Sequence, residues 1–228
     1  MKFKVFIVFV FFVYCLLPGI SLAQNKIVVS SLWSDNGNEI QTVTSNGQVW
    51  MDRNLGAVRV AQSLDDYQAY GWLYQWGRLA DGHEMRSSPT IANISGVNVP
   101  GHGNFITTSS LPYDWRRPQN NNLWQGASGV NNPCPAGFRL PTETEWDTER
   151  ASWGENNFAG AFASPLKLVV AGYRSRSNGT VHSAGSRGYY WSSTVGGSDA
   201  RSLHFDSGGA SMGRSGRAYG FSVRCLKD

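Results

Sequence analysis

The chain has 228 residues, of which 41% are hydrophobic and 16% charged, with 26 glycines and a formal net charge of +4 at pH 7. That length fits one large domain or two small ones, and the composition is typical of a loop-rich domain that contains β-strands. Without the two lysines of the first four residues, the basic count falls from 20 to 18 against 16 acidic residues, and no lysine or arginine run exists, which argues against a nucleic-acid partner.

Residues 1–23 have the organisation of a secretory signal peptide. Two lysines precede an apolar run of 13 residues at positions 5–17, a Pro-Gly pair ends the run, and small residues stand at −3 and −1 of a signal-peptidase site. The run is too short to cross a bilayer comfortably, and the residues before Cys15 make a poor lipobox. We therefore expect an exported protein, secreted or at the cell surface, without a membrane span. Its mature chain would be a single domain over residues 24–228.

The N-terminal half carries one clear hairpin signal. Asn46-Gly47 matches a two-residue turn, and the residues at 49–51 would form the returning strand. Aromatic residues at every second position predict another strand with a core-facing ladder, which we favour over a ligand platform. They are Tyr70, Trp72, Tyr74 and Trp76. Residues 78–132 show no sustained period and are rich in Gly, Pro, Asn and Ser, as functional or loosely ordered loops are.

The clearest helix start lies at Thr142. Residues 138–140 predict a short strand that a proline stops, and Thr142 with Glu145 has the spacing of a capping box. Trp146, one turn later, should face the core, and the helix should fade near residues 152–154.

Four further strands are predicted after this helix. The apolar run at 166–171 is the first, and shorter candidates lie at 189–193, 202–206 and 221–226. The order is β-rich, then one good helix, then β-rich again. This order predicts an α+β fold.

Two cysteines remain in the mature chain, Cys134 and Cys225. In an exported protein an isolated pair of this kind favours a disulfide over a metal or redox site. The bridge would close a loop of 91 residues and, through its effect on chain entropy, would stabilise the fold by roughly 4–5 kcal/mol. It would tie the start of the capped helix to the C-terminal strand and leave neither thiol for catalysis.

Known catalytic motifs are missing from the sequence. The four histidines have no zinc-binding spacing, and there is no nucleotide-binding glycine loop and no G-x-S-x-G elbow, although a Ser-His-Asp set assembled only by folding stays open. Acidic residues between 143 and 149 predict helix capping and solvation rather than an acid–base pair. We therefore expect no enzyme activity and no required cofactor.

Calcium is kept as an alternative, because the long loop offers oxygen ligands, although not at EF-hand spacing. Turn formation explains the same residues equally well. They are Asp114, Asn120, Asn121, Asn122, Asn131 and Asn132.

From residue 168 to residue 226 the composition changes. These 59 residues contain 7 Arg, 12 Ser and 11 Gly, but no Lys, Glu or Gln. Random replacement of adenine in AAC or AAT codons gives outcomes that include Asn, Ser, Gly, Arg, Asp, His, Tyr, Thr and Ala, but never Lys, Glu, Gln, Met or Trp. The bias therefore fits a diversified ligand-binding surface, and it also fits a Gly/Ser-rich loop region whose bias arose by chance.

Strand periodicity predicts one open face in this segment. In residues 202–206, Leu203 and Phe205 alternate with polar residues, so one face should be buried and the other open. Met212 would likewise point inward between small polar neighbours. Small, polar and arginine side chains on a rigid scaffold favour binding over catalysis.

Five motifs stand in order along the chain. They are VWMDRNLG at 49–56, LYQWG at 73–77, CPAGFRLPT at 134–142, YWSST at 190–194 and GFSVRC at 220–225. Together they closely resemble the Fibrobacter succinogenes major paralogous domain family, over essentially all of residues 24–228. The resemblance implies a C-type-lectin-like fold of the branch that includes formylglycine-generating enzymes.

The C-terminal part further resembles the variable proteins of diversity-generating retroelements, in which such a fold displays mutagenised residues for ligand binding. This resemblance implies a variable region at about residues 174–219 and a set of exposed ligand-binding positions within it. They would be Ser175, Arg176, His182, Ser183, Arg187, Asp199, Ser202, His204, Asp206, Ser211, Arg214 and Ser215. The scaffold positions would be Trp191, Met212, Arg217 and Arg224.

Two departures from related groups narrow the expected activity. Formylglycine-generating enzymes use an active-site cysteine pair, whereas both mature cysteines here are assigned to a disulfide, so an oxidase of that kind is the least favoured alternative. The Glu-Pro-Asn and Trp-Asn-Asp calcium motifs of sugar-binding C-type lectins are absent from the sequence. We therefore expect a display protein that binds a protein or glycan partner, with a protein preferred. The main alternative is a fixed-sequence adhesin or fimbria-associated component.

Overall fold

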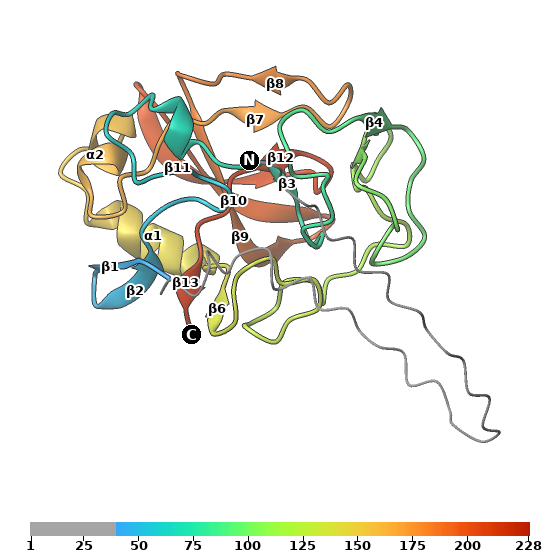
Figure 1. The fold of residues 1–228 in the computed structure, drawn as a ribbon, viewed down its shortest axis with the longest axis horizontal. Coiled ribbons are helices and arrows are strands. Elements are labelled where there is room, and N and C mark those ends of the chain that lie inside the picture. The colour runs from blue at the N-terminus through green and yellow to red at the C-terminus, as the bar shows by residue number, and fades with distance from the viewer. Residues whose placement is uncertain (1–39) are drawn as a thin grey trace, which may run out of the picture.

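The structure is a computed structural model that describes residues 40–228 (Figure 1). This part of the chain contains four small sheets and two α-helices, α1 (Glu143–Ala151) and α2 (Phe158–Ala163), so it is sheet-rich and loop-rich, as expected for an α+β protein. No helix among the described residues is long and apolar enough to cross a membrane. The predicted signal peptide and residues 24–39 lie outside the described part.

The predicted hairpin is present. β1 (Thr42–Ser45) pairs antiparallel with β2 (Gln48–Met51), and both residues of the connecting turn, Asn46 and Gly47, have positive φ. A tight hairpin turn of this type needs positive φ at both central positions, and Asn-Gly adopts it at low cost. The prediction from the sequence is therefore confirmed.

The first sheet is completed from the other end of the chain. Its order is β1-β2-β13-β6, so β13 (Leu226–Lys227) lies between β2 and β6 (Phe138–Arg139). Leu226 pairs with Trp50 on one side and with Arg139 on the other. The hairpin and the strand that precedes α1 are thus joined through β13.

Helix α1 begins with the predicted capping box. The Thr142 hydroxyl accepts a hydrogen bond from the Glu145 amide, and the Glu145 carboxylate accepts one from the Thr142 amide at 2.7 Å. The helix ends at Ala151 with Ser152 as its C-cap, close to the expected end, and Trp146 is fully buried. The Trp146 indole donates to the Trp191 carbonyl at 3.1 Å, which holds the helix against the sheet that carries the candidate site.

Glu149 corrects one expectation, because this carboxylate is buried rather than solvated. Its Oε2 atom accepts hydrogen bonds from Ser45 Oγ at 2.7 Å and from Asn46 Nδ2 at 2.8 Å, and Trp153 Nε1 donates to Oε1 at 3.3 Å. A buried carboxylate requires such donors. Glu149 therefore attaches the hairpin turn to α1.

The three longest strands form one antiparallel sheet in the order β11-β10-β9. They are β9 (Gly188–Gly196), β10 (Asp199–Asp206) and β11 (Gly209–Ser215). Both helices pack on one face of this sheet, where Leu203 and Phe205 are buried, as the alternation predicted (Figure 1). The opposite face carries the candidate site.

The remaining strands are short. β3 (Tyr74–Gln75), β12 (Gly220–Phe221), β7 (Tyr173–Arg174) and β8 (Val181–His182) form a sheet in the order β3-β12-β7-β8. A parallel pair consists of β4 (Thr90–Ile91) and β5 (Phe105–Ile106). Residues 78–132 are otherwise mostly turns and irregular backbone, which agrees with the lack of periodicity there.

The strand predicted at 166–171 is absent, although most of this run is buried. Its backbone bonds go to scattered partners: the Val170 amide donates to the Leu64 carbonyl, and the Val169 amide donates to the Tyr190 hydroxyl. Burial in a close-packed interior explains the apolar composition, whereas no neighbouring strand supplies a ladder. The strand predicted at 221–226 is likewise split, into β12 and β13.

The predicted aromatic strand around Tyr70 is reduced to β3. Gly71 has a φ of +66° and its Cα lies so close to Leu55 that an added Cβ would be 2.3 Å from the Leu55 carbonyl oxygen. The turn at Gly71 interrupts the alternation of the aromatic residues. Only a glycine can adopt this positive φ at low cost so close to another backbone segment. Three of the four aromatic rings are buried, which confirms for these three the prediction that they face the core. The fourth, Trp72, is partly exposed. The buried rings are Tyr70, Tyr74 and Trp76.

The predicted disulfide between Cys134 and Cys225 is present, with the two Cα atoms 5.9 Å apart. Cys225 directly precedes β13, and Cys134 lies before β6, so the bridge joins the same two segments as the sheet pairing. Both cysteines are therefore structural.

Three arginines of the C-terminal segment are buried: Arg174, Arg217 and Arg224. Arg224 donates to Asn54 Oδ1 at 3.0 Å and to the Leu166 carbonyl at 2.7 Å, and burial lowers its pKa to about 10. One guanidinium has five N–H donors in a fixed plane, so it can satisfy several acceptors inside a protein. The expected scaffold role of Arg217 and Arg224 agrees with this burial.

Candidate functional site

The sheet face turned away from α1 and α2 is covered at one end and open at the other. At the covered end Trp191 and Phe221 are buried and stacked, with ring centroids 4.3 Å apart. At the open end three aligned residues of β9, β10 and β11 are partly or fully exposed: Tyr189, His204 and Ser211. We refer to this open end and the loops beside it as the candidate binding face.

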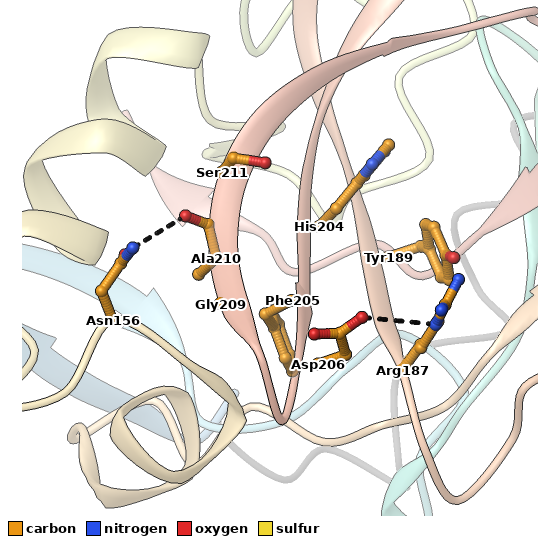
Figure 2. Close-up of a pocket in the computed structure, with 9 residues that line it drawn as sticks. All are labelled: Asn156, Arg187, Tyr189, His204, Phe205, Asp206, Gly209, Ala210 and Ser211. Carbon is orange, nitrogen blue, oxygen red and sulfur yellow. Dashed lines mark hydrogen bonds and ion pairs between the residues drawn. The ribbon is translucent and has the colours of Figure 1, made fainter.

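A first hollow of about 370 Å³ lies in this face (Figure 2). Its lining residues are Asn156, Arg187, Tyr189, His204, Phe205, Asp206, Gly209, Ala210 and Ser211. Arg187 Nε lies 3.4 Å from Asp206 Oδ2, and the Asn156 amide donates to the Ala210 carbonyl at 3.0 Å. The two charges of this hollow are therefore paired with each other. Contact with the Tyr189 hydroxyl and with Asp206 raises the pKa of Arg187.

A second hollow of about 440 Å³ shares Tyr189 and His204 with the first. Its lining residues are Tyr113, Tyr173, Arg176, Tyr189, Asp199, His204, Arg214, Ser215, Gly216, Tyr219 and Phe221. Four tyrosines make this hollow aromatic, and the guanidinium of Arg176 lies over two of them, Tyr113 and Tyr219. The Arg214 side chain lies beside Arg201 on the opposite face of the sheet, toward α1. Hydroxyl and guanidinium groups are hydrogen-bond donors, so the lining is suited to a polar or anionic ligand.

The aromatic side chains of the second hollow support one another. The Tyr173 ring meets the rings of Tyr189 and Tyr219 edge-on, at centroid distances of 5.0 and 5.7 Å. Burial raises the pKa of Tyr173, so its hydroxyl stays protonated at neutral pH. Arg176 lies over the Tyr113 ring, with Cζ 3.6 Å from the ring centroid. Packed rings of this kind give a rigid surface.

His204 forms the ridge between the two hollows. Its Nε2 atom is 2.8 Å from Ser202 Oγ and 3.4 Å from Ser215 Oγ, and its ring lies 4.8 Å from that of Tyr189. Burial, with a smaller contribution from the charge of Arg201, lowers the pKa of His204 to about 4. The imidazole is therefore neutral at pH 7. It also fits closely against Gly213, since an added Cβ there would lie 2.8 Å from the His204 ring.

Seven of the twelve predicted ligand-binding residues line one or both hollows while remaining at least partly exposed. They are Arg176, Arg187, Asp199, His204, Asp206, Ser211 and Arg214. His182 and Ser183 lie outside both linings. His182 is exposed and stacks on Tyr173 at 5.5 Å, next to the second hollow, and Ser183 occupies a turn with a φ of 56°.

Three predicted positions are buried rather than exposed: Ser175, Ser202 and Ser215. Ser202 is completely covered because its hydroxyl lies between the His204 ring and Ser215. Ser175 binds the hydroxyl and the amide of Ser177 within a turn. Ser215 still lines the second hollow. The expectation of exposure was wrong here because local hydrogen bonds draw small polar side chains inward.

The predicted set missed the tyrosines of the second hollow. Tyr189 could have been found, because it alternates with the buried Tyr190 and so must point to the open face. Tyr113 could not, because it comes from the irregular loop, far from the strands in sequence. These residues contribute most of the aromatic surface of the face.

The described residues contain one group with metal-ligand chemistry, which consists of Asp81, His83 and Glu84. His83 Nδ1 is 2.8 Å from Asp81 Oδ1, and His83 Nε2 accepts the Gln75 amide hydrogen at 3.0 Å. Burial lowers the pKa of His83 to about 4. Both ring nitrogens of a neutral imidazole are thus occupied, and hydrogen bonding accounts for the cluster.

Two of the alternative calcium ligands, Asp114 and Asn131, have clear partners within the protein. Asp114 Oδ2 accepts from Gln119 at 2.9 Å, and Asp114 lies 3.8 Å from the guanidinium of Arg217. Asn131 donates to the carbonyls of Gly77 and Asn98. These contacts favour a role in shaping the loop.

Comparison with protein-family models, with curated proteins and with solved structures finds no match for this chain. The family resemblance drawn from the sequence motifs therefore stays a prediction.

Proposed function

We propose that this is an exported ligand-binding protein whose candidate binding face contacts a protein or glycan partner. The observation that carries the proposal is the pair of hollows on either side of Tyr189 and His204. Their walls come from a three-stranded sheet that is anchored by two helices on its other face. Tyrosine and arginine on a rigid support are the residue types that contribute most to binding hot spots.

The fold in its finer form belongs to the same proposal: a C-type-lectin-like domain of the variable-protein type. Support comes from a partial separation of the predicted classes of residue, since nine of the twelve predicted variable positions are at least partly exposed. Predicted variable positions such as Arg176, His182 and Arg214 are accessible, whereas the scaffold positions Trp191 and Arg224 are buried. Substitution of the first group would therefore leave the core unchanged, which a diversifying protein requires.

The first test is deep sequencing of the gene segment for residues 174–228 in a growing population. Active diversification predicts substitutions at codons such as 176, 182, 204 and 214, with Trp191 and Cys225 constant. A uniform sequence would instead favour the alternative of a fixed-specificity adhesin.

The binding function itself is tested with a variant in which His204 and Arg214 are both replaced by alanine. Wild type and variant are compared on immobilised protein and glycan panels, and binding to the ligand found for the wild type should be lost. Circular dichroism checks that the variant keeps its fold. Unchanged binding by a folded variant would contradict the proposed face.

A further inference from the structure

The three-stranded sheet has an open edge along β11, and we propose that this edge binds an extended, acidic segment of a protein partner as a fourth β-strand. The inference goes beyond the binding function proposed above, because the edge of β11 is a surface separate from the two hollows.

Strand β11 is the last strand on its side of the sheet, whose order is β11-β10-β9. Asp206 pairs with Gly209 across a two-residue turn, so this pair exchanges both main-chain hydrogen bonds and every second pair after it does the same. The residues between these pairs turn their N–H and C=O groups away from β10. They are Ala210, Met212 and Arg214.

Side chains of the protein occupy only the first of these three outward positions. The Ala210 carbonyl accepts a hydrogen bond from Asn156 Nδ2 at 3.0 Å, which confirms that it points outward. Within residues 40–228, no hydrogen-bond partner is found for the outward main-chain groups of Met212 and Arg214. Two N–H and two C=O groups are therefore free to bind a short added strand, the mode in which main-chain hydrogen bonds hold an extended peptide.

The charge beside this edge favours an acidic strand. Arg214 pairs in register with Arg201, and both side chains approach Gly196 on the face toward α1. Arg201 Nε donates to Glu143 Oε1 at 2.7 Å, whereas no carboxylate of the described residues lies in ion-pair distance of Arg214. One positive charge is thus left unpaired. A residue opposite Arg214 on an added strand would have its Cβ about 5 Å away, where a glutamate would pair with the guanidinium.

A second copy of β11 fits this edge less well than an acidic segment. Antiparallel pairing of two copies would bring two Arg214 side chains to the same face of one continuous sheet. Like charges on neighbouring strands are destabilising, and charged side chains on edge strands are a common protection against self-pairing. The same charge that disfavours a second copy would be neutralised by an acidic strand.

An added strand would also border the candidate binding face. Ser211 and His204 are paired across β11 and β10 and project to the same side of the sheet (Figure 2). Gly213, between the two open positions, has no side chain, and the His204 ring lies 2.8 Å from where its Cβ would be. Because side chains alternate along a strand, the residues on either side of the bound glutamate would lie on the open face, next to His204.

The experiment is a ¹⁵N–¹H NMR titration of the purified protein with the N-acetylated, C-amidated peptide Thr-Thr-Val-Glu-Val-Thr-Thr at 0.15 M salt. We expect saturable shifts and slower hydrogen exchange for the amides of Met212 and Arg214. The matched peptide with lysine in place of glutamate should bind with a Kd about tenfold higher. Arg214→Glu should reverse this order, whereas the control Arg187→Glu, which makes the same charge change two strands away, should leave it unchanged.

Two N-methylated forms of the glutamate peptide test the strand geometry without altering the protein. Methylation of the glutamate nitrogen, whose N–H would face Arg214, should abolish binding. Methylation of the two valine nitrogens, whose N–H groups would face away, should leave the Kd within about twofold. Four outcomes would overturn the inference: no saturable shifts at Met212 and Arg214, equal losses with both methylated peptides, an order of Kd values that Arg214→Glu does not change, or a dimer that forms through this edge without peptide.

Failure here is distinguishable from failure of the proposed function, because His204→Ala alters the candidate binding face and Arg214→Glu alters the edge. If the glutamate peptide does not bind while His204→Ala abolishes binding of the ligand found on the panels, the edge inference fails and the proposed face stands. Loss of that ligand with Arg214→Glu but not with His204→Ala would support the edge and contradict the face.

Discussion

The buried arginines of this protein and the exposed arginines beside the hollows have the same side chain in opposite environments. Arg224 has no access to solvent and donates to Asn54 and to the Leu166 carbonyl. Arg214 is exposed on β11, and the described residues include no ion-pair partner for it. The difference lies in the acceptors around each position. The buried group is held by the fold, whereas the exposed group extends into solvent.

This contrast changes how the composition of the C-terminal segment is understood. Arg174, Arg217 and Arg224 each interact with several groups of the interior, which a single ammonium cannot do in the same geometry. The lack of lysine at these positions therefore follows from packing. The proposed codon-directed diversification would then have to explain only the arginines at exposed positions such as Arg176 and Arg214.

The largest effect on stability is expected when the disulfide bond is removed. Replacing both Cys134 and Cys225 with serine should lower the free energy of unfolding by about 4–5 kcal/mol, because the bridge closes a loop with a sequence separation of 91. Urea titration of oxidised wild type and variant measures the change. Wild type kept reduced should unfold at the same urea concentration as the variant, and a difference between these two samples would contradict the explanation.

The next largest effect concerns a buried arginine. Arg224→Met should cost about 3 kcal/mol, since it leaves Asn54 Oδ1 and the Leu166 carbonyl buried without donors. Arg224→Lys should recover part of this loss and no more, because one ammonium cannot reach both acceptors as the guanidinium fork does. Thermal and urea unfolding of both variants provide the comparison. Full stability of the lysine variant would remove the distinction between the two groups of arginines.

A smaller, pH-dependent effect is expected at the boundary between the interior and the face. The pKa of His204 is about 4 in the folded protein, below the value of about 6.5 for an unperturbed histidine. The unfolded chain therefore takes up the proton first, so stability is present above pH 6.5 and is lost as the pH falls from 6.5 to 4.

His204→Asn should reduce the loss of stability at pH 5 by roughly 1–2 kcal/mol. The buried His83 should still make the free energy of unfolding fall with decreasing pH. Urea unfolding at pH 5 and at pH 7.5 measures it. An unchanged slope would mean that His204 is solvated in solution.

The smallest effect on stability is expected at the rim. Arg214→Gln should change the free energy of unfolding by less than about 0.5 kcal/mol, because an exposed and unpaired side chain contributes little to the fold. The same urea assay used for Arg224 tests this. A loss as large as that of Arg224→Met would show that Arg214 supports the fold instead of the ligand.

Local signals in the sequence predicted local structure well. The capping box at Thr142, the Asn46-Gly47 turn and the cysteine pair each depend on a few neighbouring residues or on one bond, and all three are present. The apolar run at 166–171 failed as a strand prediction because burial and strand formation favour the same residues. Helix α2 was missed because it is a six-residue Phe-Ala-Gly segment without a clear period.

The candidate site was only partly predictable for a related reason. Alternation in β10 correctly separated Leu203 and Phe205 from His204, because period two is a property of any strand. The burial of Ser202 depends on a hydrogen bond to His204 and on Ser215 in the next strand. The second hollow needs Tyr113 from a distant loop. Such contacts are set by the tertiary structure, which no short-range pattern specifies.

The position of β13 between β2 and β6 also bears on the order in which the chain can be completed during synthesis. Trp50 and Leu226 are neighbours in the sheet although nearly the whole described chain separates them. Pairings of this range form slowly, and an unpaired strand edge attracts other chains until its partner arrives. A nascent chain therefore has β2 with one edge open until Leu226 has left the ribosome. Holding the chain unfolded until synthesis is finished, as export across a membrane does, would protect that edge from aggregation.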